Sequence, residues 1–548
     1  MPDERSQERA SEEEEVALLI EGDRGTAAAP TQTAPQKEVK LPAVVWAVQV
    51  PQFAIALQYQ VPFVVGVYLV RQLVGPDGSE DTIGRMAGML GGMGSAGACV
   101  TALAWGFASD RWGRRPVVMV GCVASGVSII LMALAPAFWL ACLARFSGGL
   151  FNGTIGAIKA AIAEACDAVG ANQATAFGLM STAWGAGSVV GPMLAGLLSR
   201  PCDAVPDAPL CAPDTGLLAR QPYLLPCVAT ALALWLASLV VLGMPETAPR
   251  VLRAREAAAR QRVGKDVEMA AMADGRGADA SWRRSDSAAT LPHAPGSPPS
   301  GEGDGTGRPD VAPVSAADGR WKDGSEVGAA SMSDRDWWRS GQVRATVLGY
   351  GAVALLYCIM DEVTPIFGSA AVADGGLGLL EHQLALPLSV GGIVLVVQAV
   401  YVFPRLSKRF GVHRVLRWSL AGQAPTTFLV PATSVAAGAG APRAVVLALL
   451  AMAVVVKVVC SVCMFTGSII LINKASPPNA IGAINGLAMT VAALMRACGP
   501  MLGGLLWGAS LTVGMPAHQY FPFAVTSALC VATWHLYGKV VPDRPAGR

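Results

Sequence analysis

Residues 177–198 read FGLMSTAWGAGSVVGPMLAGLL, and residues 485–506 repeat the pattern as NGLAMTVAALMRACGPMLGGLL. From Gly178 and Gly486 onward, ten of the twenty-one aligned positions are identical, including the run GPML in both copies. Each copy lies within an apolar stretch, one in each half of the chain. Two similar multi-span halves are the way in which many membrane carriers build a site between repeats. The repeat therefore predicts a carrier made of two related halves.

The composition around this repeat is that of a membrane protein. Of the 548 residues, 53% are apolar and only 15% are charged, whereas a soluble domain carries about a quarter charged residues. The apolar residues form blocks of about 20 residues or more, long enough to cross roughly 30 Å of hydrocarbon as a helix. We therefore predict an all-α membrane protein with twelve transmembrane helices in two pseudo-symmetric six-helix bundles. The predicted spans are residues 43–69, 87–107, 117–136, 139–163, 174–198, 223–244, 345–367, 384–404, 415–436, 443–471, 483–508 and 520–541.

The polar segments complete the predicted organisation. The first 40 residues are acidic and lack an apolar period, and the segment after the sixth span is rich in Gly, Ala, Ser, Asp and Arg, so both are expected to be disordered. Lys and Arg are concentrated in the loops after the second, sixth and eighth spans, which places both termini in the cytosol by the positive-inside rule. The predicted order is a cytosolic tail (1–40), an N-terminal bundle (41–247), a cytosolic linker (248–341), a C-terminal bundle (342–541) and a cytosolic C-terminal tail (542–548).

Several classes of function find no support in the sequence. The formal net charge of +2 gives no electrostatic case for binding nucleic acid. The five His residues are scattered without an i, i+4 pair, so we predict neither an enzyme nor a metal site, and no cofactor. The expected partners are a small-molecule solute, protons and the lipid bilayer, and the chain is expected to act as a monomer. Cys202 and Cys211 share the non-cytosolic loop after the fifth span, and the sequence leaves open whether they form a disulfide.

The N-terminal tail contains a candidate sorting signal. Glu14, Leu18 and Leu19 resemble an acidic dileucine motif, which adaptor proteins read as a route to vacuolar or lysosomal membranes. The alternative is a frayed amphipathic tail without a role in sorting. The motif favours a vacuolar or lysosome-like membrane, with the plasma membrane as the alternative location.

The loop between the second and third spans carries a charged motif, GFASDRWGRRP, over residues 106–116. It resembles the loop motif G-x-x-x-D-R-x-G-R-[RK] of the major facilitator superfamily. A Gly turn, a carboxylate able to face a helix N-terminus and Arg side chains able to bridge helices give the motif its physical logic. The resemblance implies a latch on the cytosolic side, whereas the alternative is a set of arginines that only fixes topology. The second half carries a partial match to this motif at residues 407–411, with Lys408 in the place of Asp110. The matching residues are Gly106, Asp110, Arg111, Gly113, Arg114 and Arg115.

The repeated segment itself resembles the antiporter motif of drug:proton exchangers. Small residues four apart let two helices approach closely, and Pro192 bends the helix that carries them. By this resemblance the motif favours antiport over symport, and the alternative is a packing seam that does not determine direction. The matching residues are Gly178, Gly187, Gly191, Pro192 and Gly196.

Charged residues inside the predicted spans indicate a pathway for solute and protons. A charge in mid-membrane costs at least about 2.5–3.5 kcal/mol, so it should face a cavity or a partner. In the fourth span, Arg145, Asn152 and Lys159 recur every seven residues, which predicts one polar stripe along a continuous helix. Lys159, near the cytosolic end, is expected to snorkel to the interface.

The seventh span presents Tyr350, Tyr357 and Asp361 on one face, with Glu362 adjacent. Asp361 is a candidate proton carrier, because burial of a membrane carboxylate favours its neutral form. The alternative is a permanent ion pair with Arg145, Lys457 or Arg496, and the two readings need not exclude each other. The membrane cations match or outnumber the deeper carboxylates, which favours an anionic or zwitterionic solute. The candidate solute and proton pathway comprises Arg145, Asn152, Tyr357, Asp361, Glu362, Lys457 and Arg496.

Within the superfamily, the chain resembles the zinc-induced facilitator-like transporters of plants. The resemblance rests on GAIKAAIAE (156–164), STAWG (181–185), PYLLPC (222–227), PET (245–247) and NGLAMT (485–490). It implies proton exchange for an organic chelator or another small solute, often at the vacuolar membrane. The family's C-P-G-C near the N-terminus and its His pair after P-E-T are missing, which argues against a zinc-linked role.

We therefore expect a secondary active transporter, a proton-coupled antiporter that moves a small organic solute out of the cytosol. The solute is expected to be anionic or zwitterionic, and metal chelators belong to this class. A drug or xenobiotic exporter of the same fold is the neighbouring alternative. A transport-inactive membrane sensor is the alternative from another class, although the polar linker offers no folded sensor domain. No nucleotide-binding loop is present, so ATP-driven pumping is not expected.

Overall fold

The computed structural model describes residues 40–212, 216–253, 339–477, 480–512 and 517–540. Within these ranges all regular structure is helical. Residues 1–39 of the predicted tail, nearly all of the predicted linker and the C-terminal tail lie outside the described residues, as do Glu14, Leu18 and Leu19. The structure therefore concerns the two predicted bundles.

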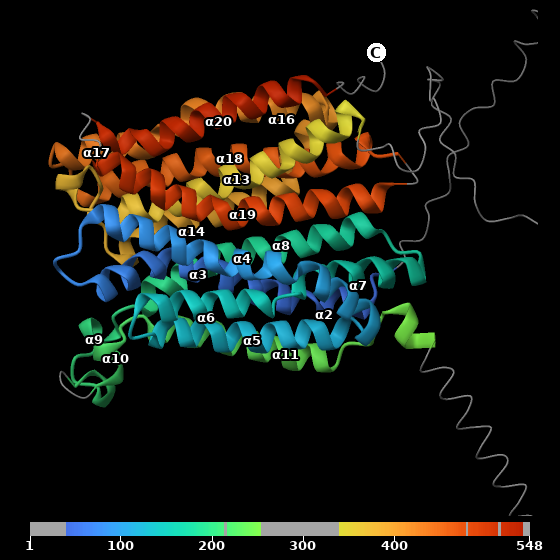
Figure 1. Ribbon diagram of the computed structural model, residues 1–548, viewed down its shortest axis with the longest axis horizontal. Coiled ribbons are helices and arrows are strands. Elements are labelled where there is room, and N and C mark those ends of the chain that lie inside the picture. The colour runs from blue at the N-terminus through green and yellow to red at the C-terminus, as the bar shows by residue number, and fades with distance from the viewer. Residues whose placement is uncertain (1–39, 213–215, 254–338, 478–479, 513–516, 541–548) are drawn as a thin grey trace, which may run out of the picture.

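The N-terminal half consists of long helices, a short helix α2 before the first of them, and the short helices α9 and α10 in a loop (Figure 1). The long helices lie side by side, and the short helices α9 and α10 lie at one end of the bundle. The helices are α2 (Ala43–Ala47), α3 (Gln49–Val74), α4 (Glu80–Trp112), α5 (Arg114–Leu134), α6 (Phe138–Leu150), α7 (Thr154–Val169), α8 (Gln173–Leu198), α9 (Pro201–Ala204), α10 (Leu217–Arg220) and α11 (Leu224–Leu242).

The C-terminal half repeats this arrangement with its own set of helices. One of its segments changes from α-helix to a π-helical turn, η5, and back. The elements are α13 (Gly341–Ser369), α14 (Glu381–Val397), η5 (Gln398–Val402), α15 (Phe403–Phe410), α16 (Val412–Thr426), α17 (Leu429–Gly438), α18 (Arg443–Ala475), α19 (Ile481–Thr512) and α20 (Phe521–Gly538).

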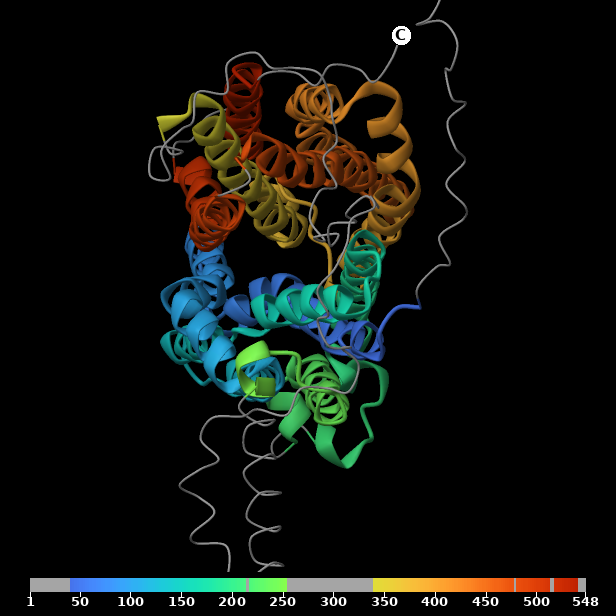
Figure 2. The ribbon, with the colours of Figure 1, turned by 90° about the vertical axis from the view of Figure 1, so that its right-hand side faces the viewer.

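The two halves are related by pseudo-symmetry. Figure 2 shows the N-terminal half, blue to green, and the C-terminal half, yellow to red, as two adjoining groups of helices. Within the first half α8 packs on α3, and within the second its counterpart α19 packs on α13. The same correspondence relates α4–α6 to α14–α18, and α5–α11 to α16–α20. The duplicated sequence thus reflects duplicated packing, as predicted.

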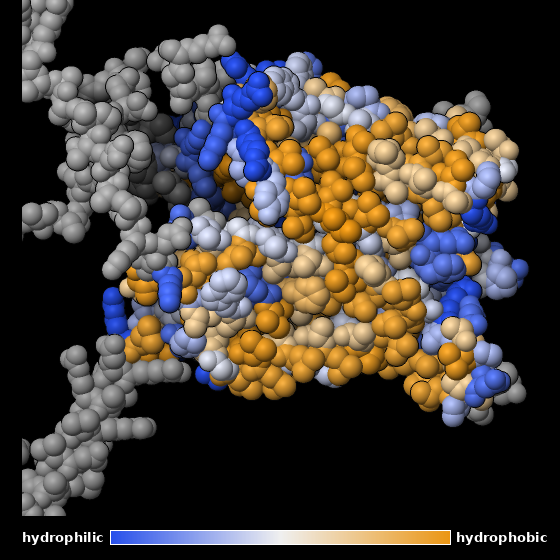
Figure 3. Space-filling view, turned by 180° about the vertical axis from the view of Figure 1, so that it is seen from behind, coloured by the Kyte–Doolittle hydropathy of each residue, from blue (hydrophilic) through white to orange (hydrophobic). Residues whose placement is uncertain are grey.

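The surface has the apolar belt that a bilayer requires. Eight helical segments of the described chain are long and apolar enough to cross a membrane, and the space-filling view shows an apolar band between two more polar ends (Figure 3). The other four predicted spans, residues 139–163, 174–198, 415–436 and 520–541, correspond to α6–α7, α8, α16–α17 and α20. The structure confirms the all-α membrane fold, while the count of twelve crossings stays a prediction.

The fourth predicted span is not continuous, which corrects the polar stripe expected there. Its helix breaks at residues 151–153 between α6 and α7. The carbonyl oxygen of Leu150 at the break accepts hydrogen bonds from Thr101 Oγ1 (2.8 Å) and Trp105 Nε1 (2.7 Å). Side chains of a neighbouring helix therefore satisfy the backbone group that the break exposes. Arg145 and Lys159 therefore lie on different helices, α6 and α7. A seven-residue spacing no longer places them on one helix face, because the helix is interrupted between them.

Glycines allow the two halves to cross closely. A Cβ atom on Gly88 of α4 would overlap the carbonyl oxygen of Pro500 and lie 2.8 Å from the Cα atom of Gly504 of α19. In the pseudo-symmetric crossing, a Cβ atom on Gly392 of α14 would lie 2.7 Å from the backbone nitrogen of Val189 of α8. Small residues at such positions permit backbone-to-backbone packing in a membrane. The helices of the repeat thus form the seam between the halves.

Candidate functional site

A cavity lies at this seam, between α3 and α8 of the first half and α13, α14 and α18 of the second. Most of its wall is apolar or glycine. Gln60 Nε2 donates a hydrogen bond to Ser188 Oγ at 3.1 Å on the N-terminal side. The other half contributes most of the polar groups, and the polar lining residues are Gln60, Ser188, Tyr357, Asp361 and Lys457.

The two charged residues of the cavity form an ion pair. Lys457 Nζ of α18 donates to Asp361 Oδ1 of α13 at 2.6 Å, and the side chains are 4% and 19% exposed, respectively. Of the partners that the sequence left open for Asp361, the structure selects Lys457. The Tyr357 hydroxyl, one turn away on α13, also interacts with the Asp361 carboxylate. Tyr350, from the same face of α13, packs instead against Phe465 and Met489.

Glu362, the next residue along α13, points away from the ion pair and toward α4. Its side chain is 3% exposed and lies against Gly91 of α4, where its Oε2 atom has no hydrogen-bond partner in the described chain. Arg145 of α6, 5% exposed, lies against Gly94, which also belongs to α4. Its Nε atom likewise has no hydrogen-bond partner among the described residues. A buried carboxyl and a buried guanidinium from opposite halves thus approach α4 at neighbouring glycines without forming an ion pair.

The remaining residues of the predicted pathway are dispersed. Asn152 lies in the break of the fourth span, and its Nδ2 donates to Gln58 Oε1 of α3 at 3.4 Å. Arg496 of α19 turns back along its own helix to donate to the Ala492 carbonyl at 3.2 Å. Lys159 of α7 lies within electrostatic reach of Arg496, so cations from both halves are placed near one another. The structure therefore brings together Tyr357, Asp361 and Lys457, but not all seven predicted residues.

The predicted antiporter motif places α8 between both halves. Gly187 and Gly191 lie against Ala56 and Gln60 of α3, whereas Gly196 lies against Ala385 at the start of α14. Pro192 lines the cavity. Gly178 is the exception, since a Cβ atom there would meet nothing within 4 Å. Close approach therefore explains three of the four glycines.

The predicted gating loop is organised around Arg114. Its guanidinium donates to Asp110 Oδ1 at 2.6 Å, to Ser109 Oγ at 2.8 Å and, through two nitrogens, to Glu164 of α7 at 2.7 and 3.2 Å. Arg114 thereby joins the ends of α4, α5 and α7. Gly106 has open space around it, and the Arg111 side chain is exposed.

Glu246, after α11, completes this network. Its carboxylate accepts hydrogen bonds from the backbone N–H groups of Arg114 (2.8 Å) and Arg115 (3.2 Å), at the N-terminus of α5. A carboxylate is stabilised there by the unpaired N–H groups and by the helix dipole. Gly113 adopts a φ of +109°, and a Cβ atom there would overlap Glu246. The conformation and the contact both require glycine.

The sequence motif of the predicted gating loop does not include Glu164 or Glu246, although both contact Arg114. Both carboxylates follow an apolar stretch that ends on the predicted cytosolic side, which is the signal that could have placed them beside the arginines.

Within the described residues, no group of three or more His, Cys, Asp or Glu could hold a metal ion. Cys202 and Cys211 form a disulfide.

Comparisons with known proteins agree with this architecture. The family model of the Major Facilitator Superfamily matches residues 52–500. The major facilitator superfamily multidrug transporter mfsB of Aspergillus fumigatus is 28% identical over 75% of this chain and 69% of that protein. Protein ZINC INDUCED FACILITATOR 1 of Arabidopsis thaliana is 27% identical over 78% of this chain and 76% of its own length.

Solved structures show the same fold at low sequence identity. A D-xylose–proton symporter superposes with a TM-score of 0.59 at 15% identity, covering 91% of this chain and 98% of that protein. The inward-open xylose transporter of E. coli gives a TM-score of 0.54 at 15% identity, over 91% and 96% of the two chains. The duplicated bundles, the charged loop after α4 and the match along most of the sequence lead to one assignment. The chain belongs to the major facilitator superfamily, as a transporter related to zinc-induced facilitator and multidrug carriers.

Proposed function

We propose that the protein is a proton-coupled antiporter that moves a small zwitterionic solute, such as an amino-acid-derived metal chelator, out of the cytosol. The observation that carries the proposal is the Asp361–Lys457 pair in the cavity between the halves. A zwitterion can enter such a pair with its ammonium group on Asp361 and its carboxylate on Lys457. Both buried charges then keep a partner, whereas a purely anionic or cationic ligand leaves one of them uncompensated.

The charge arrangement also supports a role for Glu362 as the proton-binding group. Protonation of Asp361 would leave Lys457 as a buried cation without its partner, at a cost of about 3–5 kcal/mol. In the described chain the Oε2 atom of Glu362 has no hydrogen-bond partner, and burial of a carboxyl in such surroundings favours its neutral form. A proton on Glu362 removes a negative charge next to the ammonium site, so proton and solute binding oppose each other. Such opposition is the basis of exchange.

The other predicted residues receive supporting roles in this proposal. Arg145 is the cation that can meet Glu362 when the halves move, and Arg496 and Asn152 are assigned to the solute pathway outside the cavity. The glycines of the antiporter motif hold α8 between the halves, and the network of Asp110, Arg114, Glu164 and Glu246 acts as the cytosolic latch. The candidate dileucine signal supports a vacuolar or lysosome-like membrane with both termini cytosolic, and the plasma membrane is the alternative.

Flux through purified protein in proteoliposomes tests the proposal. With an imposed pH gradient, nicotianamine, a zwitterionic chelator, should drive proton movement that a lumenal pH dye reports. Succinate, an anion without an ammonium group, should drive much less. The Glu362→Gln variant should bind nicotianamine but lose the pH dependence. Solute flux that is unchanged after the gradient is collapsed would refute proton coupling.

A second candidate is export of lipophilic drugs, favoured by the similarity to the multidrug transporter mfsB. The apolar and glycine wall of the cavity is compatible with it. Tetraphenylphosphonium, a lipophilic cation, distinguishes the two in the same assay. If it drives proton exchange and nicotianamine does not, the drug exporter replaces the zwitterion carrier.

A further inference from the structure

The hydrogen bonds that the described residues form between the two halves lie at one end of the molecule. In the part of the chain that the structure describes, four hydrogen bonds connect them, and all lie at the end that carries α9 and α10, the predicted non-cytosolic end (left in Figure 1). Two use backbone carbonyl acceptors, from the Tyr68 hydroxyl to Leu379 (2.7 Å) and from Arg71 to Ser369 (3.3 Å). The other two converge on one carboxylate.

That carboxylate is Glu381, the first residue of α14. Its Oε1 atom accepts from the Tyr223 hydroxyl at 2.8 Å and from Arg200 Nε at 3.1 Å, both from the N-terminal half. Glu381 is 2% exposed and Tyr223 is 2% exposed. The Tyr223 hydroxyl is the donor in this contact and the buried Glu381 carboxylate is the acceptor. A buried carboxylate held by two donors from the opposite half is a strong contact between moving parts.

Arg200 is held in an unusual backbone conformation. Its φ is +49°, in the left-handed region that costs a non-glycine residue roughly 1–2 kcal/mol. Its N–H donates to the Pro222 carbonyl at 2.9 Å, which ties it to the residue before Tyr223. Such a conformation persists only where the surrounding structure fixes it. The two donors to Glu381 are therefore positioned together.

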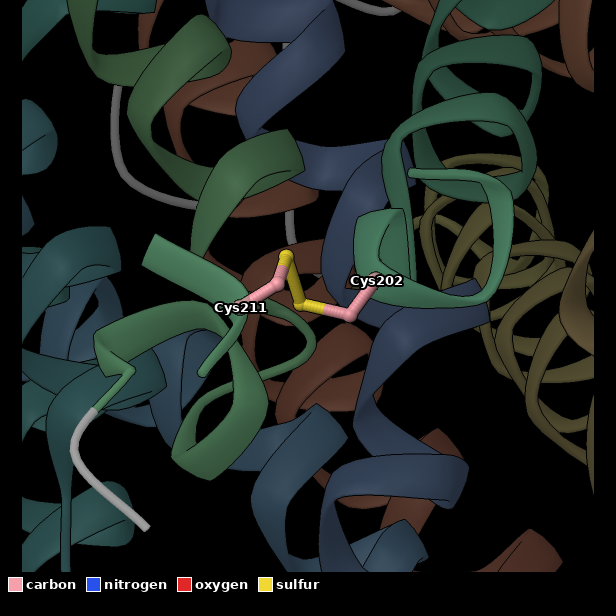
Figure 4. The surroundings of a disulfide bond; sticks show 2 residues. All are labelled: Cys202 and Cys211. Carbon is pink, nitrogen blue, oxygen red and sulfur yellow. A yellow bond between two sulfur atoms is a disulfide. The ribbon is translucent and has the colours of Figure 1, made fainter. Parts of the chain in front are cut away.

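The Cys202–Cys211 disulfide begins two residues beyond Arg200 (Figure 4). It closes the short loop that contains α9, whose first residue, Pro201, directly follows Arg200. A crosslink here restricts the conformations of the loop and keeps the start of α9 against the end of α8. Arg200, the charged partner of Glu381, therefore lies just before the loop that the disulfide closes, and the closed loop fixes its position.

We propose that Arg200, Tyr223 and Glu381 form the non-cytosolic gate of the carrier, and that the Cys202–Cys211 disulfide holds Arg200 in the position that closes it. When these contacts break, α14 is released from the ends of α8 and α11, and the cavity opens to the non-cytosolic side. The disulfide therefore biases the carrier toward the conformation with this end closed. Arg200 and the disulfide act as positioning elements of the transport cycle, independently of which solute or ion is carried.

Hydrogen–deuterium exchange of the full-length protein in nanodiscs tests the gate without solute or a pH gradient. Tyr223→Phe and Glu381→Gln each weaken a hydrogen bond to a charged group, so exchange at residues 66–74 and 377–384 should rise about tenfold. Arg200 is partly exposed, so Arg200→Gln and the Cys202→Ser/Cys211→Ser variant should each raise it by about two- to fivefold. Exchange at residues 173–182, on the cytosolic side of α8, should fall in all four variants.

Two comparisons separate a gate from a structural contact. In the Glu381→Gln background, the two serine substitutions should add almost nothing, because Arg200 has lost its charged partner. Asp81→Asn, which breaks the Asp81–Arg85 pair within α4 at the same end, is the matched control and should leave exchange at both ends unchanged. A uniform rise at both ends, an undiminished serine effect in the Glu381→Gln background, or no effect of the serine pair would overturn the proposal. Tyr223→Phe, which removes one hydroxyl, preserves the test if a charge variant fails to fold.

Discussion

The strongest quantitative prediction concerns the ion pair in the cavity. Asp361→Asn leaves the ammonium of Lys457, 4% exposed, without its carboxylate partner at 2.6 Å. Breaking a buried pair from one side costs about 3–5 kcal/mol, and because Asp361 itself is 19% exposed we expect the lower end, about 3 kcal/mol. Asp361→Asn/Lys457→Met removes both charges, so most of that loss should be recovered.

Unfolding of the four proteins of this cycle in mixed lipid–detergent micelles, followed by tryptophan fluorescence, gives the coupling free energy. We expect about 2–3 kcal/mol between the two positions. Glu80→Gln, which breaks the more exposed Arg71–Glu80 pair, is the control and should cost less than about 1 kcal/mol. The double variant should be folded and yet unable to exchange a zwitterion. A single variant as stable as the wild type, or a double variant no more stable than the single ones, would refute the assignment of a buried pair.

Two further predictions address the latch and the seam between the halves. Asp110 is largely exposed, so Asp110→Asn should cost under about 1 kcal/mol and slow turnover without abolishing solute binding, whereas Glu246→Gln removes a charged cap from α5 and should cost about 1–2 kcal/mol. Melting temperature and turnover measure both, and an Asp110 variant with normal turnover would contradict the latch. Gly88→Ala places a methyl group on the Pro500 carbonyl and should lower the melting temperature and weaken the α4–α19 crossing, whereas Gly178→Ala, in open space, should be neutral. Equal melting temperatures for these two variants would show that close approach does not govern the seam.

The duplicated segment predicted the architecture because packing geometry constrains its residues. Gly191 and Gly499 occupy equivalent positions and lie against Gln60 of α3 and Cys358 of α13, which are themselves equivalent helices. A glycine that must face a neighbouring helix in both halves leaves the same trace in both copies of the sequence. The apolar blocks gave the remaining helices, since their length follows from the thickness of a bilayer.

The polar contacts of the site could not be predicted in the same way. The sequence offers several cations as ion-pair partners of Asp361. Only the relative placement of α13 and α18 shows that the partner is Lys457. The break after Leu150 depends on Trp105 and Thr101 from another helix, which no periodicity within the fourth span reveals. Partners of this kind are determined by tertiary packing, so they are invisible to spacing along one helix.

The loops at Gly113 and Gly411, which pseudo-symmetry relates, share their backbone turn but differ in their charged residues. Gly113 ends α4 and starts α5 with a φ of +109°, and Gly411 ends α15 and starts α16 with a φ of +83°. The turn is therefore retained in both halves, because each loop must reverse the chain at the membrane surface. Its chemistry is not: a Cβ atom on Gly113 would overlap Glu246, whereas Gly411 has open space and Lys408 stands where Asp110 would align. The charged network around Arg114 is therefore not repeated at Gly411, and because its partners Asp110, Glu164 and Glu246 all belong to the N-terminal half, it ties helices together within that half.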